Sequence, residues 1–199
     1  PEEGEELLRD ARHGVSDGRG VELGLIETLN VANDAFDGRV IANYVLDRCE
    51  QHGRPITNLS LQKIVYFCHV WSLLKLERPL IKHKFEAWQH GPVLQYLYQE
   101  FKQYDKSKIT GRAHAIDLAT GEKVVARRTV DEATGQLLDQ VIDFYSRLSA
   151  GYLVDLSHVS GGPWDSVWNH GGSINPGMKI DNDEIVRFYS KAVSQFGIQ

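Results

Sequence analysis

Three polar side chains stand at regular intervals in an otherwise apolar stretch of the chain. Gln62, Tyr66 and His69 are spaced at i, i+4 and i+7, so they share one face of a predicted helix. Glu86 and His90 follow soon after and could meet that face. One hypothesis is therefore an enzyme that uses Gln62, His69, Glu86 and His90 in a small polar pocket. The alternative, which we favour, is that these groups satisfy one another inside the core, as buried polar atoms must.

Two other patterns match hydrolase motifs in residue type only. Residues 14–18 read Gly-Val-Ser-Asp-Gly, which fits the GxSxG nucleophile elbow, but that motif needs a preceding strand and the sequence predicts none. Ser157 and His158 could join Asp155 or Asp165 in a triad, yet a triad is defined by its geometry. We expect Ser157 and His158 to end a short helix instead.

Neither a metal nor a cofactor site is predicted. The chain has eight histidines, but no HExxH motif, cysteine pair or calcium loop, and it lacks the glycine patterns of nucleotide sites. A helix start at His90-Gly91-Pro92 could bind an anion through its free N–H groups. Because proline removes one of those donors, we interpret this segment as a turn.

Composition is typical of one globular domain with a tail. The net charge of -5, from 22 basic and 27 acidic residues, argues against electrostatically driven nucleic-acid binding. Cys49 and Cys68 are expected to be buried free thiols. Since no apolar run can span a bilayer and no leader opens the chain, we expect a cytoplasmic protein. Residues 1–32 are predicted to be a flexible arm or extension, and residues 33–199 one domain.

Apolar periodicity predicts a mainly α (α+β) fold, a compact helical domain around a buried central helix. One amphipathic helix ends at Gly53. The next is capped by Ser60, runs to about Leu76 and is apolar on nearly every side, so it is the predicted central helix. Residues 85–88 are predicted to be extended, and Pro92 to be the first residue of a new helix.

The second half of the chain is predicted to hold a small β-hairpin and several helices. The hairpin strands are residues 109–118 and 123–128, with Gly121 supplying a positive φ in the turn. A capping box from Thr129 to Glu132 opens a helix that ends at Gly151. A short helix is predicted at 153–158, a short turn from Gly162 through Trp168, and a final helix capped by Asp181.

Four blocks of the sequence, in this order, resemble a known family. They read VIANYVL at 40–46, ITNLSLQKIVY at 56–66, FEAWQHGPV at 85–93, and LSH followed by PW at 156–164. The pattern resembles the Panacea domain of the SocA-like antitoxins, which include phage-associated GepA-type proteins, over roughly residues 33–190. The family-motif residues, expected to form the scaffold or a polar pocket, are Thr57, Leu61, Gln62, Lys63, Tyr66, His69, Glu86, Trp88, His90, Gly91, Pro92, His158 and Trp164.

The resemblance implies an antitoxin of a bacterial or prophage toxin–antitoxin system, which neutralises a cognate protein toxin by direct contact. Such a binder needs no catalytic group, and we expect none. The resemblance also implies an alternative role, a proteolytic adaptor that delivers the toxin to a ClpXP-type protease. Because the motif residues are mostly apolar or turn-forming, we expect the toxin to contact other, exposed surface, first of all residues 1–30 and the hairpin at 109–128.

Overall fold

The fold is mainly α, as predicted, and it has two small antiparallel strand pairs where the sequence predicts one hairpin. The computed structural model describes residues 35–169 and 178–196, so the predicted arm at 1–32 lies outside the described residues. Among the described residues, none of the helices combines the length and the apolar composition of a membrane span. The elements are α2 (Gly38–Gln51), α3 (Asn58–Lys75), β1 (Glu86–Trp88), β2 (Gly91–Val93), α4 (Gln95–Phe101), the 3-10 turn η3 (Lys102–Tyr104), β3 (His114–Ile116), β4 (Lys123–Val125), α5 (Glu132–Tyr145), α6 (Ala150–Ser157), α7 (Pro163–Trp168) and α8 (Asn182–Phe196).

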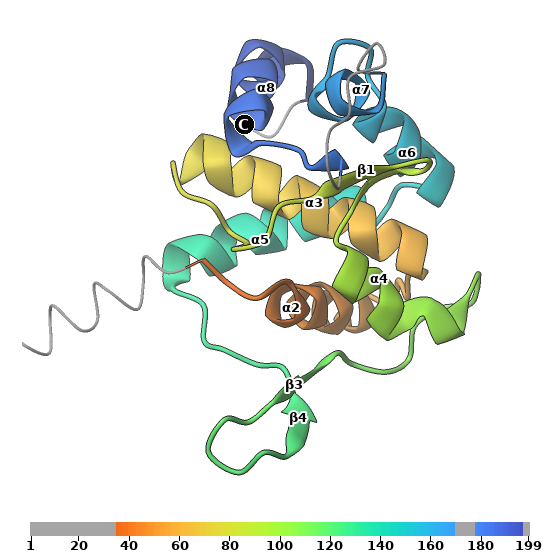
Figure 1. The fold of residues 1–199 in the computed structure, drawn as a ribbon, viewed down its shortest axis with the longest axis vertical. Coiled ribbons are helices and arrows are strands. Elements are labelled where there is room, and N and C mark those ends of the chain that lie inside the picture. Colours follow the sequence, from red (N-terminus) through yellow and green to blue (C-terminus); the bar gives the residue numbers. More distant parts are fainter. Residues whose placement is uncertain (1–34, 170–177, 197–199) are drawn as a thin grey trace, which may run out of the picture. The chain divides into compact units, whose positions relative to one another are not determined.

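Helix α3 is the central helix of the domain, as its all-round apolar sequence predicts. Fifteen of its 18 residues are buried, and α2 and α5 lie along it (Figure 1). Its N-cap is Thr57, whose side chain accepts a hydrogen bond from the backbone of Ser60. The prediction that Ser60 caps this helix is therefore wrong. Ser60 lies inside the first turn, where its N–H is one of the groups that the cap must satisfy.

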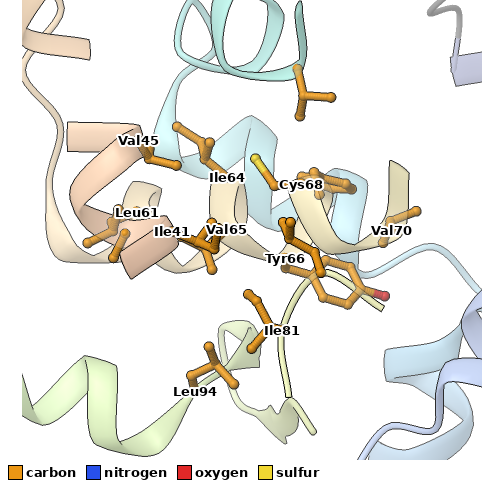
Figure 2. Close-up of a cluster of buried hydrophobic side chains, with 14 of the residues drawn as sticks. Ile41, Val45, Leu61, Ile64, Val65, Tyr66, Cys68, Val70, Ile81 and Leu94 are labelled. Carbon is orange, nitrogen blue, oxygen red and sulfur yellow. The ribbon is translucent and has the colours of Figure 1, made fainter. Parts of the chain in front are cut away.

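The core forms where the apolar faces of α2 and α5 meet α3. Figure 2 shows Ile41 and Val45 of α2 beside Leu61, Ile64 and Val65 of α3. On the α5 side, the ring of Tyr145 stacks on Phe67 with centroids 4.4 Å apart. Its hydroxyl accepts a hydrogen bond of 3.1 Å from the indole of Trp71. The family-motif residue Leu61 is thus a core residue, fully buried at the α2–α3 contact.

The predicted start and the predicted end of α5 are both wrong. Asp131, not Thr129, caps the helix, because its carboxylate accepts from the backbone of Thr134 and is held there by an ion pair with Arg78. The helix ends at Tyr145 rather than at Gly151. The side chain of Ser149 then caps α6, so Gly151 lies in the first turn of that helix.

The first strand pair replaces a predicted helix start. Strands β1 and β2 pair antiparallel, with Trp88 opposite Gly91 across a two-residue turn. Gly91 has a φ of 97°, a backbone conformation that would be strained for any residue with a side chain. Glycine at this position therefore allows the chain to reverse direction. Pro92 therefore lies in β2 and not at the start of α4. A proline is tolerated there because each strand of a two-stranded ribbon has an open edge.

The second strand pair is the predicted hairpin, with shorter strands than expected. Strand β3 pairs antiparallel with β4, and Gly121 in the connecting turn has the predicted positive φ. This hairpin extends away from the helices, on the α2 side of the domain (Figure 1). Helices α6, α7 and α8 pack on the opposite side, beside α3 and the β1–β2 hairpin.

Candidate functional site

The polar stripe of α3 consists of Gln62, Tyr66 and His69, which the sequence predicts on one face of the helix. These side chains contact three different parts of the molecule. His69 is 1% exposed. Its Nδ1 accepts a hydrogen bond from the backbone N–H of Ile81, so its Nε2 carries the proton and donates to Asn182 at the start of α8. Burial lowers the pKa of His69 to about 4, an effect that the bond to Asn182 opposes only partly. This imidazole is neutral, and it joins α3 to α8 and to the segment before β1.

Replacement of His69 should remove an acid sensitivity of the fold. Because its pKa is about 4 in the folded protein and 6.5 for a histidine in water, only the unfolded chain takes up this proton between those values. Stability from His69 is therefore complete above about pH 6.5 and is lost as the pH falls toward 4, by roughly 3 kcal/mol in all. We expect urea unfolding of His69→Asn to show less loss between neutral and acid pH than the wild type. His90→Asn, at an exposed turn, should follow the wild type, and equal acid losses in all three proteins would contradict the assignment.

Gln62 and Tyr66 complete the stripe, with contacts of their own. The carbonyl of Gln62 accepts from the backbone of Leu94, and its amide donates to Asn58. Tyr66 is fully buried, which raises its pKa well above the usual value, and its hydroxyl interacts with that of Tyr189 on α8. Gln62 and His69 thus bind backbone and side-chain partners in the core, whereas the buried hydroxyl of Tyr66 lacks a hydrogen bond of standard geometry among the described residues. The geometry matches the favoured interpretation better than a shared pocket.

Glu86 and His90 lie on the β1–β2 hairpin and do not share these contacts. The carboxylate of Glu86 accepts from the indole of Trp88, 2.9 Å away. His90 is exposed in the two-residue turn. The four residues of the enzyme hypothesis are therefore divided between the core and the hairpin. Among the described residues, moreover, no three His, Cys, Asp or Glu side chains gather as a group that could hold a metal ion.

Lys63 is the least expected feature of the family motif, because a buried lysine has no apolar or turn-forming role. It is 0% exposed, and its ammonium donates a hydrogen bond of 2.7 Å to the carbonyl of Pro92. Burial lowers its pKa to about 7. A Cβ on Gly91 would lie 2.9 Å from Lys63 Nζ and 2.5 Å from Ser157 Oγ. The β1–β2 hairpin therefore sits directly on the lysine, and only glycine allows this approach.

The late LSH and PW blocks pack against the same hairpin. The ring of His158 stacks on Trp164 with centroids 3.6 Å apart, and the Trp164 indole donates to the carbonyl of Trp88. Burial, with the nearby Lys63 charge as a second cause, lowers the pKa of His158. Ser157 donates its hydroxyl to the carbonyl of Val154, so the structure provides no Ser–His pair for a triad. Both residues end α6, as predicted.

The family-motif residues thus converge on α3 and on the β1–β2 hairpin that packs against it. They cap α3 (Thr57), fill the core (Leu61), or fix the β1–β2 hairpin through Lys63, Gly91 and Trp164. Their geometry is that of a scaffold. Whether any of them also serves a partner is a separate prediction.

Asn43 is a site residue that was not singled out from the sequence. It lies on α2, is 2% exposed, and binds the base of the β3–β4 hairpin. Its amide donates to the carbonyls of Ala113 (2.9 Å) and Ala126 (2.8 Å), and its carbonyl accepts from the N–H of Ala113 (2.7 Å). One asparagine therefore joins both strands to the helical body. The available signal was a polar residue on the buried face of an amphipathic helix.

The hairpin held by Asn43 exposes apolar side chains. Leu118 is 98% exposed and Ile116 58%, and Val124 and Val125 are also exposed. Isolated exposed apolar residues are common on protein surfaces, but a group of them on a projecting element is typical of an interaction surface. These four residues are called the hairpin surface, which includes both faces of the ribbon because Val124 and Val125 are consecutive in β4, and it is the candidate functional site.

Comparison with known proteins supports the family resemblance of the sequence. The family model described as "Antitoxin SocA-like, Panacea domain" matches residues 61–165. The chain is 36% identical to Antitoxin SocA of Caulobacter vibrioides (strain NA1000 / CB15N) over 164 residues, which cover 80% of this chain and 87% of that protein. No solved structure gives a significant match. On this evidence the chain belongs to the SocA-like antitoxin family with a Panacea domain.

Proposed function

We propose that this chain is an antitoxin that neutralises a cognate protein toxin by binding it directly, without a catalytic step of its own. The observation that carries the proposal is the likeness to Antitoxin SocA along 87% of that protein's length. The contacts that motif residues make in the core and with the β1–β2 hairpin fit a scaffold that presents a binding surface. We place this activity in the cytoplasm, where a toxin that acts inside the cell would be met.

The hairpin surface is the part of the described domain that we propose contacts the toxin. It combines exposed apolar side chains with a position away from the packed helices (Figure 1). Asn43 holds the base of the β3–β4 hairpin, so binding a partner should cost little conformational entropy for ordering the two strands. A few buried apolar anchors usually dominate the energy of such an interface.

Growth of cells that express the neighbouring gene, with and without this chain, tests the proposal. We expect the neighbouring product to be toxic alone and the wild-type chain to restore growth. A double variant, Leu118→Ser with Val124→Ser, should bind at least about tenfold more weakly and fail to restore growth. Both side chains are exposed, so the variant should keep its stability within about 0.5 kcal/mol.

Val186→Ser provides the matched control, because Val186 is an exposed apolar residue on α8. It should restore growth as the wild type does. If the neighbouring product is harmless, or toxicity persists beside the wild-type chain, the antitoxin proposal is wrong. If instead the toxin disappears only when both this chain and a ClpXP-type protease are present, the adaptor role replaces simple blocking.

A further inference from the structure

The β3–β4 hairpin is a two-stranded ribbon with two outer edges. The bonds from Ala126 N to Ala113 O and from Asp117 N to Glu122 O mark two of its hydrogen-bonded pairs. In an antiparallel ladder these pairs alternate with pairs whose backbone groups point outward. The pairs His114–Val125 and Ile116–Lys123 therefore present their N–H and C=O groups to the outer edges.

The edge beside β3 is partly covered by the domain itself. The outward N–H of His114 donates to the carboxylate of Glu100 on α4, 3.0 Å away. The outward carbonyl of the same residue accepts from the guanidinium of Arg39 on α2. Side chains of two helices thus occupy the backbone groups at the base of this edge.

The edge beside β4 has no such cover within the part of the chain that the structure describes. Outside the ladder, no hydrogen bond from a described residue reaches the backbone of Lys123 or Val125. All three residues of β4 are exposed. Proteins usually protect an open edge of this kind, because it is a template for a further strand. The shortness of β4 and the charge of Lys123 are its only protection among the described residues, so the edge is open to a further strand.

A groove continues this edge where β4 ends. It has a volume of about 400 Å³ and lies between α2 and residues 126–129. Val40 and Tyr44 of α2 contribute its apolar lining. Arg127 lines it with a side chain that is 65% exposed and forms an ion pair with Asp47, which also lines the groove. A strand paired with β4 could continue along this groove and bury side chains there.

Charge indicates which kind of strand would fit. Lys123 and Arg127 flank the two valines of β4, and no acidic residue lies between them. Three of the 22 basic and nine of the 27 acidic residues lie in residues 1–34, so residues 35–199 hold 19 basic and 18 acidic residues. The negative net charge of the chain therefore does not belong to the domain that carries the hairpin. An acidic strand would meet Lys123 at this edge, and Arg127 beyond it, where it would compete with Asp47 for the exposed guanidinium.

We propose that the partner adds an extended, acidic segment to the open edge of β4 as a third strand. This inference rests on the proposed function, and it identifies the partner's contacting element. Backbone bonds to Lys123 and Val125 supply affinity that depends little on sequence. Acidic side chains of the segment pair with Lys123 and Arg127, and its apolar side chains contact Val124 and Val125.

A proline at Val125 tests the backbone pairing. Val125→Pro removes an outward N–H without a ladder bond, which an edge strand tolerates. Val125→Ala also shortens the side chain but keeps the N–H. In the growth assay and in binding to the purified neighbouring product, Val125→Pro should lose about tenfold or more in affinity, and Val125→Ala no more than about threefold. Equal behaviour of the two variants overturns the proposal.

Two further measurements make the result independent of how well a proline variant folds. Amide hydrogen exchange at Lys123 and Val125 of the wild-type chain should slow on binding. Protection already present in the free chain would mean that this chain or a second copy occupies the edge, and would overturn the proposal. Arg127→Glu should weaken binding, whereas Arg147→Glu, an exposed arginine that follows α5, should not. Equal binding by both charge variants would exclude an acidic strand.

Failure of the wild-type chain to bind the neighbouring product would count against the proposed function alone. A short peptide of alternating Glu and Val then serves as the probe. It should shift the amide resonances of Lys123 and Val125, and a version with methylated backbone nitrogens should not. An absence of shifts, or equal shifts with both peptides, overturns strand addition.

Discussion

Replacement of Asn43 by alanine should release the β3–β4 hairpin from the helical body. The change removes three hydrogen bonds and leaves the N–H and C=O of Ala113 and the C=O of Ala126 without this partner. A buried polar group left unsatisfied costs about 1–3 kcal/mol, so the free energy of unfolding should fall by about 3 kcal/mol or more. Urea unfolding measures this loss directly. Amide exchange should be accelerated most at Ala113 and Ala126.

Asn58→Ala separates the loss of stability from the loss of the hairpin. Asn58 is also a buried asparagine, but it donates to the carbonyl of Tyr98 and accepts from Gln62, so it joins α3 to α4. Its variant should lose stability yet keep the hairpin amides protected. At a temperature where both variants remain folded, only Asn43→Ala should fail to restore growth beside the toxin. If both restore growth equally, the hairpin does not need its attachment in order to work.

The helices were predictable because their signals are local and repeated. The all-round apolar sequence of α3 could only be buried, and the inner face of α5 repeats over several turns. Caps were predicted less well. Thr57 and Ser60 both have a hydroxyl and stand three residues apart, so either one could begin α3 on sequence alone. Only the packed structure shows which of the two residues precedes the helix.

Pro92 shows where local signals fail. A proline after a turn suits the first position of a helix and also an edge strand, and residue type does not distinguish the two. The deciding interaction comes from far along the chain. Lys63 on α3 binds the carbonyl of Pro92, and Trp164 on α7 binds the carbonyl of Trp88. These long-range bonds hold the segment as a hairpin.

Only part of the candidate site was predictable, because local signals indicate the hairpin but not the long-range contacts that attach it. A turn with Gly121 between two β-prone runs indicates a hairpin. Its attachment to α2 through Asn43 joins residues far apart in sequence, which periodicity cannot detect. The polar stripe of Gln62, Tyr66 and His69 was visible, but its partners Leu94, Tyr189 and Asn182 were not.

Replacement of Lys63 by methionine should change how stability depends on pH. Its pKa is about 7 in the folded protein and 10.5 for a lysine in water, with burial as the only cause of the difference. Between those values the unfolded chain binds a proton that the folded chain does not, so stability rises with pH in this window. The slope is about 1.4 kcal/mol per pH unit. From about pH 7 to about pH 9 the wild type should therefore gain roughly 2 kcal/mol relative to Lys63→Met.

Urea unfolding of both proteins at several pH values in this window measures the difference between them. Other titrating groups are common to the two proteins and cancel. Near neutral pH the two stabilities should be close, because methionine leaves the carbonyl of Pro92 without its donor but removes the cost of burying a charge. Lys106→Met, at an exposed position, should show the pH dependence of the wild type. A constant difference between wild type and Lys63→Met would mean that the ammonium reaches water. In that case the β1–β2 hairpin would not exclude water from Lys63, although Gly91 and Pro92 of the hairpin lie against its ammonium group.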